Sequence, residues 1–181
     1  MSNSLIVQKY GGTSLGTLER VEHVAHRIAK ARKAGTDIVV VVSAMAGETD
    51  KLLKMAHSLT KNPARREIDL LLSSGERISA SLLTIALQVR GIPALSMTGR
   101  QIGLQTDSTH TRARIKNIDA QRARKMLKKN HVIVVAGFPS AFVGILFTGN
   151  LLIEIIFSLD GLGLLGFEAV INRDYPVMFG T

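Results

Sequence analysis

The sequence predicts an α/β fold in which helices cover a mostly parallel sheet, followed by an apolar helical tail. Short β-branched runs, such as residues 38–42 and 132–136, are continuously apolar, which is typical of parallel strands buried on both faces. Segments with apolar residues at helical spacing separate these runs. Alternation of strands and helices indicates parallel strands joined by helical crossovers.

The first half of the predicted domain begins with a buried strand at residues 4–9. Residues 17–34 are predicted to form a helix, because Lys33 and Gly35 are the expected stop signals and five apolar residues recur at helical spacing, namely Val21, Val24, Ala25, Ile28 and Ala29. A strand at residues 38–42 follows. The next helix, residues 50–60, is broken before Pro63.

Two further helices are predicted at residues 65–74 and 76–90. The apolar face of the second comprises Ile78, Leu82, Ile85, Ala86 and Val89. The remaining elements are a strand at residues 93–97, a loop over 98–111, a short strand at 112–118, a basic helix at 119–130 and a strand at 132–136.

Charge is unevenly distributed along the 181 residues, whose net charge is +9. Residues 1–131 hold 22 of the 23 Lys and Arg and 10 of the 14 Asp and Glu, whereas residues 132–181 carry a balance of −3. Aromatic residues make up 4%, so the stacking platforms of a nucleic-acid groove are missing and no nucleic-acid partner is expected. The absence of cysteine excludes disulfides, and the five histidines show no metal-ligand pattern.

Residues 140–157 contain a single charge, Glu154. As a helix they would span about 27 Å, which is near the hydrocarbon thickness of a bilayer. Lysines precede the segment, as they do on the cytoplasmic side of a membrane helix. Two interpretations stay open: a membrane-associated segment, or a buried helix of a globular core.

The motif KYGGTS, Lys9 to Ser14, lies between a predicted strand and a predicted helix. Two glycines let the backbone approach an anion, and the N–H groups that begin the helix would point at it. Lys9 adds a positive charge. The alternative is a tight strand-to-helix turn, which also needs glycine.

Two more clusters occupy comparable positions. Ser43 and Thr49 follow the strand at 38–42, so they are expected at the carboxyl edge of the sheet, where ligands bind in open α/β folds. Alternatively, Thr49 or Asp50 is only a helix cap. In SSGERIS, Glu76 would pair with a substrate ammonium, or would simply be a carboxylate in the first turn of a helix.

The three clusters, in this order, resemble aspartate kinases of the amino-acid kinase family over about residues 5–138, including TGRQIGLQTDSTHTRARI. The resemblance implies ATP-dependent phosphorylation of the aspartate side-chain carboxylate, with Mg²⁺. It implies that Lys9 binds the ATP phosphates as a catalytic residue, that Gly11, Gly12, Thr13 and Ser14 complete the phosphate site, and that Ser43, Thr49 and Glu76 hold L-aspartate. Lysine, threonine and methionine synthesis is the implied pathway, and the cytoplasm the implied location of residues 1–137.

The sequence also departs from that family. No GRGGSD-type motif and no nucleotide-base site follow residue 138, so the chain as it stands is expected to be inactive. Residues 138–181 resemble instead a permease of peptide-type ABC transporters, with IFSLDGLG and RDYP as the matching residues. The expected organisation is a truncated kinase domain, 1–137, joined to a permease-like segment. A transport fragment and a basic binding module are the rival interpretations, and a homo-oligomer is compatible with each of them.

Overall fold

The computed structural model describes residues 4–106, 115–118 and 121–137. A parallel sheet has the strand order β1-β2-β6-β3, formed by β1 (Leu5–Tyr10), β2 (Asp37–Val42), β6 (Val132–Ala136) and β3 (Ala94–Met97). The α/β class predicted from the sequence is therefore confirmed. The predicted tail, including residues 140–157, lies outside the described residues.

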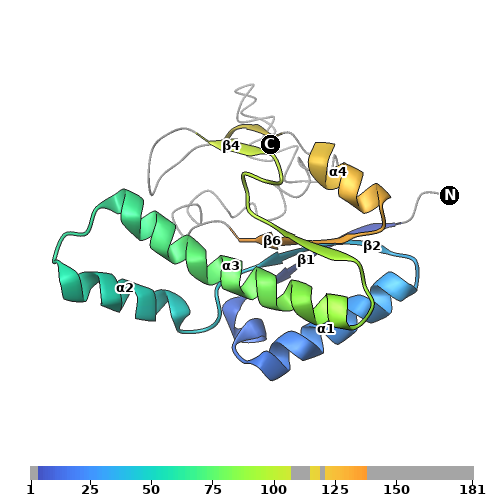
Figure 1. Ribbon diagram of the computed structural model, residues 1–181, viewed down its shortest axis with the longest axis horizontal. Coiled ribbons are helices and arrows are strands. Elements are labelled where there is room, and N and C mark those ends of the chain that lie inside the picture. Colours follow the sequence, from blue (N-terminus) through green and yellow to red (C-terminus); the bar gives the residue numbers. More distant parts are fainter. Residues whose placement is uncertain (1–3, 107–114, 119–120, 138–181) are drawn as a thin grey trace, which may run out of the picture.

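Helices cover both faces of the sheet (Figure 1). On one face lie α1 (Leu18–Lys33) and α3 (Arg65–Val89), and on the other lies α4 (Gln121–Lys128). The other described helices are a short 3₁₀ turn, η1 (Gly12–Leu15), and α2 (Glu48–Leu59), which packs along α3.

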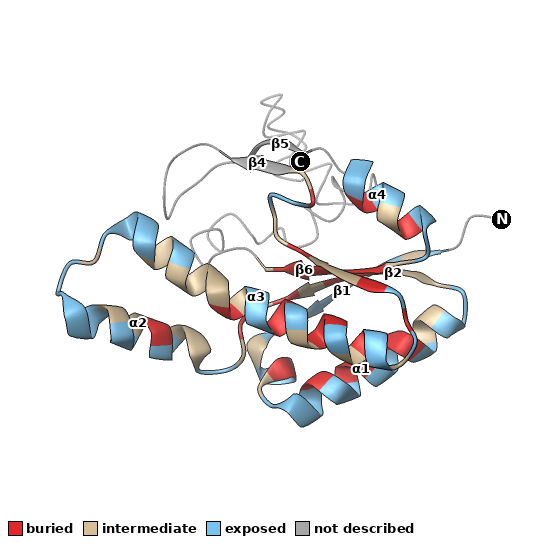
Figure 2. Cartoon of the chain, viewed as in Figure 1, coloured by how far each residue is buried: buried red, intermediate tan, exposed pale blue. Residues whose placement is uncertain are grey.

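Successive strand residues belong to two separate cores. Figure 2 shows that β2 and β6 are largely buried. Val40 and Val134 face α1 and α3, whereas Val39 and Ile133 face α4. Side chains of a strand alternate between the two faces of its sheet, so burial on both faces requires every position to be apolar. This explains the continuous β-branched runs in the sequence.

Helix α3 corrects two sequence predictions. It is one continuous helix over Arg65–Val89, not two. The face predicted to be apolar is largely exposed: Ile78 is 48% exposed, Ile85 55% and Val89 80%. The buried face contains Leu83 and Leu87 together with small residues, namely Gly75, Ser79, Ala80 and Thr84.

The small residues explain why that face is buried. The hydroxyls of Ser79 and Thr84 donate to the carbonyls of Gly75 and Ala80, at 3.3 and 2.7 Å, so neither needs water. The helix is long and apolar enough to cross a bilayer by those criteria alone, but its small-residue face packs on the sheet and on α1.

A second, two-stranded antiparallel sheet joins β4 (Leu104–Thr106) to β5 (Ile115–Ile118). The strand β5 lies within the strand predicted at 112–118. In contrast, β4 lies in the segment 98–111 that was predicted to be a loop, so that prediction was wrong for these residues. Three residues are too few to show the alternation from which a strand is predicted.

Candidate active site at the carboxyl edge of the sheet

The carboxyl ends of β1, β2 and β6 form one edge of the sheet, because the three strands run parallel and in register. The backbone N–H of Ser43 donates to the carbonyl of Tyr10 at 3.1 Å, and that of Gly137 donates to the carbonyl of Val42 at 2.7 Å. These two bonds continue the strand pairing into the loops. The loops that carry the sequence motifs therefore start side by side.

The glycine turn after β1 packs against the loop after β2. A Cβ on Gly12 would stand 2.5 Å from the carbonyl oxygen of Ala44, and the carbonyl of Gly12 accepts from the N–H of Ala46 at 3.2 Å. Only glycine allows this approach. Around Gly11, by contrast, an added Cβ would meet nothing within 4 Å among the described residues, so the backbone there is open to a ligand.

The helix predicted at residues 17–34 is confirmed almost to its ends as α1, but a short 3₁₀ turn separates it from the two glycines. The turn continues into η1, and α1 begins only at Leu18, with the hydroxyl of Thr17 accepting from the N–H of Arg20 at 3.3 Å. One of the N–H groups of α1 therefore has a partner within the helix cap. The prediction that N–H groups at the start of this helix bind an anion stays a prediction.

Lys9 is exposed and pairs with Val41 in the register of β1 and β2. Its side chain lies on the same face of β1 as those of Leu5 and Val7, which pack against the core on the α4 side. Since strand side chains alternate, Lys9 belongs to the α4 face and Tyr10 to the α1 face. The phosphate-binding role predicted for Lys9 and the alternative of a purely structural turn both remain compatible with this position.

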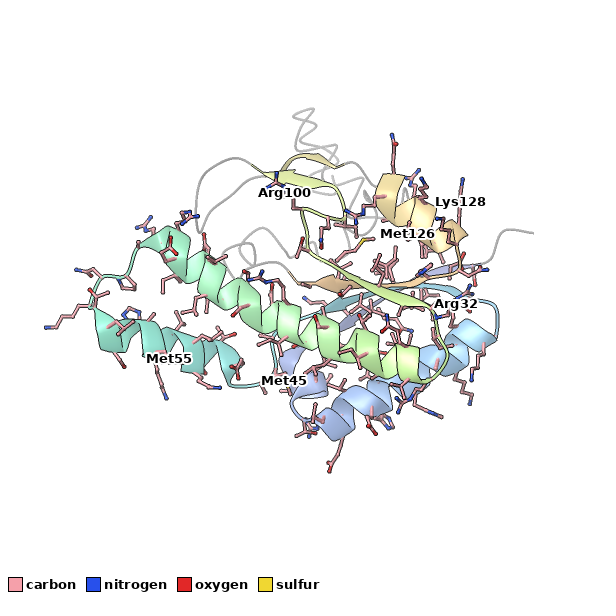
Figure 3. The ribbon with its side chains drawn as sticks, in the orientation of Figure 1. Arg32, Met45, Met55, Arg100, Met126 and Lys128 are labelled. Atoms are coloured by element: carbon pink, nitrogen blue, oxygen red, sulfur yellow. The ribbon has the colours of Figure 1, made fainter. Side chains whose placement is uncertain are left out.

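Ser43 and Thr49 lie at the two ends of one short loop. Ser43 directly follows β2 and is half-buried, and Thr49 lies in the first turn of α2. The N-cap of α2 is Gly47, in the left-handed conformation with φ +80°, so the predicted alternative of Thr49 or Asp50 as the cap is wrong. Met45, within this loop, lies between α2 and the glycine turn (Figure 3).

Glu76 lies in the middle of α3, not in a first helical turn, so helix-dipole stabilisation does not explain it. Its carboxylate lies over the ends of β2 and β6, because a Cβ on Gly137 would be 3.1 Å from its Oε1 and 2.6 Å from the carbonyl of Val42. Its Oε2 is buried and accepts no hydrogen bond from any described residue. Burial raises the pKa of Glu76 from 4.5 to about 7.

Burying a carboxylate without a hydrogen-bond partner destabilises the fold. At the carboxyl edge of a parallel sheet such a group is a candidate for binding a cationic ligand. Gly75 brings this part of α3 close to the β2 loop, since its Cβ would stand 3.1 Å from that of Ala44. No three His, Asp or Glu side chains of the described residues gather as a metal centre.

Two features of the edge were missed from the sequence. Gly137 makes room for Glu76, and Gly12 and Gly75 make room for the carbonyl oxygen and the Cβ of Ala44, respectively. A glycine directly after a continuous β-branched strand was the available signal for the first.

Comparisons with known proteins agree with this arrangement. The sequence profile of the amino acid kinase family matches residues 4–151. This match extends past residue 138, where the sequence analysis placed a boundary. An aspartate kinase of Stutzerimonas stutzeri is 53% identical over 135 residues, which are 75% of this chain and 33% of that protein. An aspartokinase of Geobacillus stearothermophilus is 47% identical over 134 residues, again 33% of its length.

Solved structures show the same likeness. The aspartate kinase from Synechocystis is 47% identical, with a TM-score of 0.65 over 75% of this chain and 22% of that one. Aspartokinase III of E. coli in complex with aspartate and ADP, at 19% identity, a TM-score of 0.58 and coverage of 74% of this chain and 40% of that one, shares the fold. The chain spans about a third of the length of the curated relatives it matches. With a match of the family profile over most of its length, the chain belongs to the amino acid kinase family.

Proposed function

We propose that this chain is the amino-terminal part of an aspartate kinase, which transfers the γ-phosphoryl group of ATP to the side-chain carboxylate of L-aspartate. The observation that supports this most is the meeting of all three sequence motifs at one sheet edge: the glycine turn contacts the loop after β2, and Glu76 lies beside Gly137. The names of the relatives, about half identical in sequence, support the same reaction.

The glycine turn suits the phosphates of ATP. Gly12 is fixed by its close approach to Ala44, while the surroundings of Gly11 leave space for an anion. Lys9, exposed beside the turn, would neutralise charge on the γ-phosphoryl group, and the hydroxyls of Thr13 and Ser14 would add hydrogen bonds. In phosphoryl transfer the protein acts mainly by positioning and charge neutralisation.

Mg²⁺ in this proposal arrives with ATP. Mg²⁺ is usually held by one or two carboxylates together with the substrate phosphates, so it needs no cluster of protein ligands.

Glu76 suits the ammonium group of L-aspartate. Its Oε2 is buried without a partner among the described residues, so a bound ammonium would supply the missing hydrogen bond and favour the ionised carboxylate. Ser43 and Thr49, from the loop between β2 and α2, would orient the substrate beside it. The aspartate carboxylate would then attack the phosphorus, forming an acyl phosphate and releasing ADP.

The finer points of organisation are proposals too. We place residues 1–137 in a kinase domain in the cytoplasm, serving lysine, threonine and methionine synthesis, and we leave a homo-oligomer open. Residues 138–181 lie outside the described residues, so their permease-like character and membrane association through residues 140–157 rest on the sequence pattern alone.

A segment exchange tests the catalytic proposal. Residues 4–137 of this chain would replace the matching segment of the Stutzerimonas stutzeri aspartate kinase, and aspartyl phosphate formation would be measured. We expect the hybrid to be active and to lose activity in Lys9→Ala and Glu76→Gln. Glu67→Gln, which removes an exposed carboxylate from the same helix as Glu76, is the matched control. A folded hybrid in which Lys9→Ala keeps full activity would contradict the proposed role of Lys9.

A further inference from the structure

An open pocket lies between η1 and the first half of α1. Its volume is about 340 Å³, and one face of α1 supplies Arg20, His23, Val24 and Arg27. These positions recur at helical spacing and so form a single wall. Tyr10, Thr13 and Ser14 form the opposite wall.

This pocket lies on the other face of the sheet from Lys9. Tyr10 packs with the core beneath α1 and α3. Lys9 lies on the opposite face of β1, together with the residues that pack beneath α4. Neither Gly11, Gly12, Ser43 nor Glu76 lines it. The pocket therefore shares only Thr13 and Ser14 with the residues proposed to bind the phosphates of ATP, and its other lining residues belong to β1 and α1.

The side chains of the pocket suit an anion. Two guanidinium groups line it and no carboxylate does. Arg20 donates through Nη1 to the carbonyl of Thr13, which holds its guanidinium at the pocket while leaving other N–H groups available. Helix α1 also contains Glu19, next to Arg20, and Glu22, whose Oε2 lies 3.9 Å from Nη2 of Arg90, but neither lines the pocket.

The hydroxyl of Tyr10 donates to Oε1 of Gln8 at 3.0 Å, so its oxygen can accept a hydrogen bond from a ligand. The positive charge of Arg27 lowers the pKa of Tyr10, but burial raises it by more, and the phenol stays neutral. Val24 and the ring of Tyr10 add an apolar surface. A pocket of this size accepts a small organic group in addition to an anionic one.

We propose that this pocket binds a small phosphate monoester, with Arg20 and Arg27 on the phosphate group and Val24 and Tyr10 against its organic part. Guanidinium groups pair with phosphate through parallel, charge-assisted hydrogen bonds. Because Thr13 and Ser14 belong to the glycine turn, an occupied pocket would hold that turn from the side opposite Lys9. The binding itself does not depend on the proposed kinase activity.

Binding of inorganic phosphate and phenyl phosphate to the full 181-residue chain tests this. Calorimetry would give the affinities, and amide chemical shifts of His23 and Arg27 would locate the ligand. We expect both probes to shift these amides, with phenyl phosphate binding more tightly. Arg27→Gln should weaken binding by about tenfold or more, since it removes a charge-assisted contact. Arg20→Gln provides a second variant should the first fold poorly.

Two variants decide where the anion binds. Lys30→Gln removes one charge from an exposed position of α1 outside the pocket and should change the affinity by less than about twofold. Lys9→Ala should leave the shifts at His23 and Arg27 unchanged. Equal weakening by Lys30→Gln and Arg27→Gln would show only a general attraction of anions. That result, loss of the shifts in Lys9→Ala, or no shifts at all would overturn the proposal.

Discussion

The carboxylate of Glu76 and the backbone of Gly137 share one confined space: a Cβ on Gly137 would stand 3.1 Å from Oε1 of Glu76. The same Cβ would stand 2.6 Å from the carbonyl oxygen of Val42, which is closer than real Cβ contacts. The absence of a side chain at Gly137 thus permits α3 to place a carboxylate over the ends of β2 and β6.

Gly137→Ala should therefore destabilise the protein by about 1–3 kcal/mol, the usual cost of overpacking. Urea unfolding would measure the change. Gly11→Ala is the matched control, because φ at Gly11 is −75° and its Cβ would meet nothing within 4 Å. It should change the free energy of unfolding by less than about 0.5 kcal/mol. Equal effects of the two substitutions would show that the contact at Gly137 relaxes at no cost.

The pH dependence of stability should report the burial of Glu76. Its pKa is about 7 in the folded chain and 4.5 as the reference value for the unfolded chain, so the folded state retains a proton between these pH values. The free energy of unfolding should then fall as pH rises from about 4.5 to 7. The full difference corresponds to about 3 kcal/mol.

Glu76→Gln should remove this dependence and make the protein more stable than the wild type at pH 8. Urea unfolding at pH 4.5 and pH 8 measures both effects. Glu67→Gln, at an exposed position of α3, should retain the wild-type dependence. If Glu76→Gln lost as much stability as the wild type on going to pH 8, the buried carboxyl would not be its source.

The isolated chain should form aspartyl phosphate at a negligible rate. Its 181 residues contain no GRGGSD-type motif, and each missing charged group of a transition state costs orders of magnitude in rate. A coupled assay for ADP formation with L-aspartate tests this. Turnover at the rates typical of enzymes, abolished in Lys9→Ala, would refute it, because that loss would rule out a contaminant.

Arg32 ties the opposite end of the sheet together (Figure 3). Its Nη2 donates to Oδ1 of Asn130 at 2.9 Å, and its Nη1 lies 3.5 Å from Oδ1 of Asp37 and donates to the carbonyl of Thr36 at 3.2 Å. The Arg32 side chain is only 12% exposed, so Arg32→Ala should cost about 1–3 kcal/mol in urea unfolding. Lys33→Ala, exposed in the same turn, should cost much less, and a similar cost would show that the contacts of Arg32 do not account for its effect.

Membrane association should depend on residues 138–181. The full chain is expected to sediment with membranes or aggregates, and deletion after residue 138 to reduce this, because residues 140–157 are apolar around the whole helix they are predicted to form. Ultracentrifugation of expressed protein measures the distribution. A monodisperse full-length chain in detergent-free buffer would contradict the expectation and favour a packed core helix.

Much of the fold follows from the sequence by itself. All four parallel strands were predicted, two of them, β2 and β6, from continuous β-branched runs. Helical spacing with Lys33 and Gly35 predicted α1 almost to its ends. The motifs could be assigned to one edge because parallel strands end together, and Lys9, Gly12 and Ser43 do lie there. These features depend on local propensity and strand direction, which the order of residues encodes.

Tertiary packing decided the rest. The buried face of α3 contains Ser79 and Thr84 in place of the more apolar Ile78 and Ile85, because small residues allow close approach to the sheet and their hydroxyls bond within the helix. Hydrophobicity along the chain does not contain this information. The raised pKa of Glu76 likewise arises only where α3 crosses the ends of β2 and β6, since burial by distant segments is its cause.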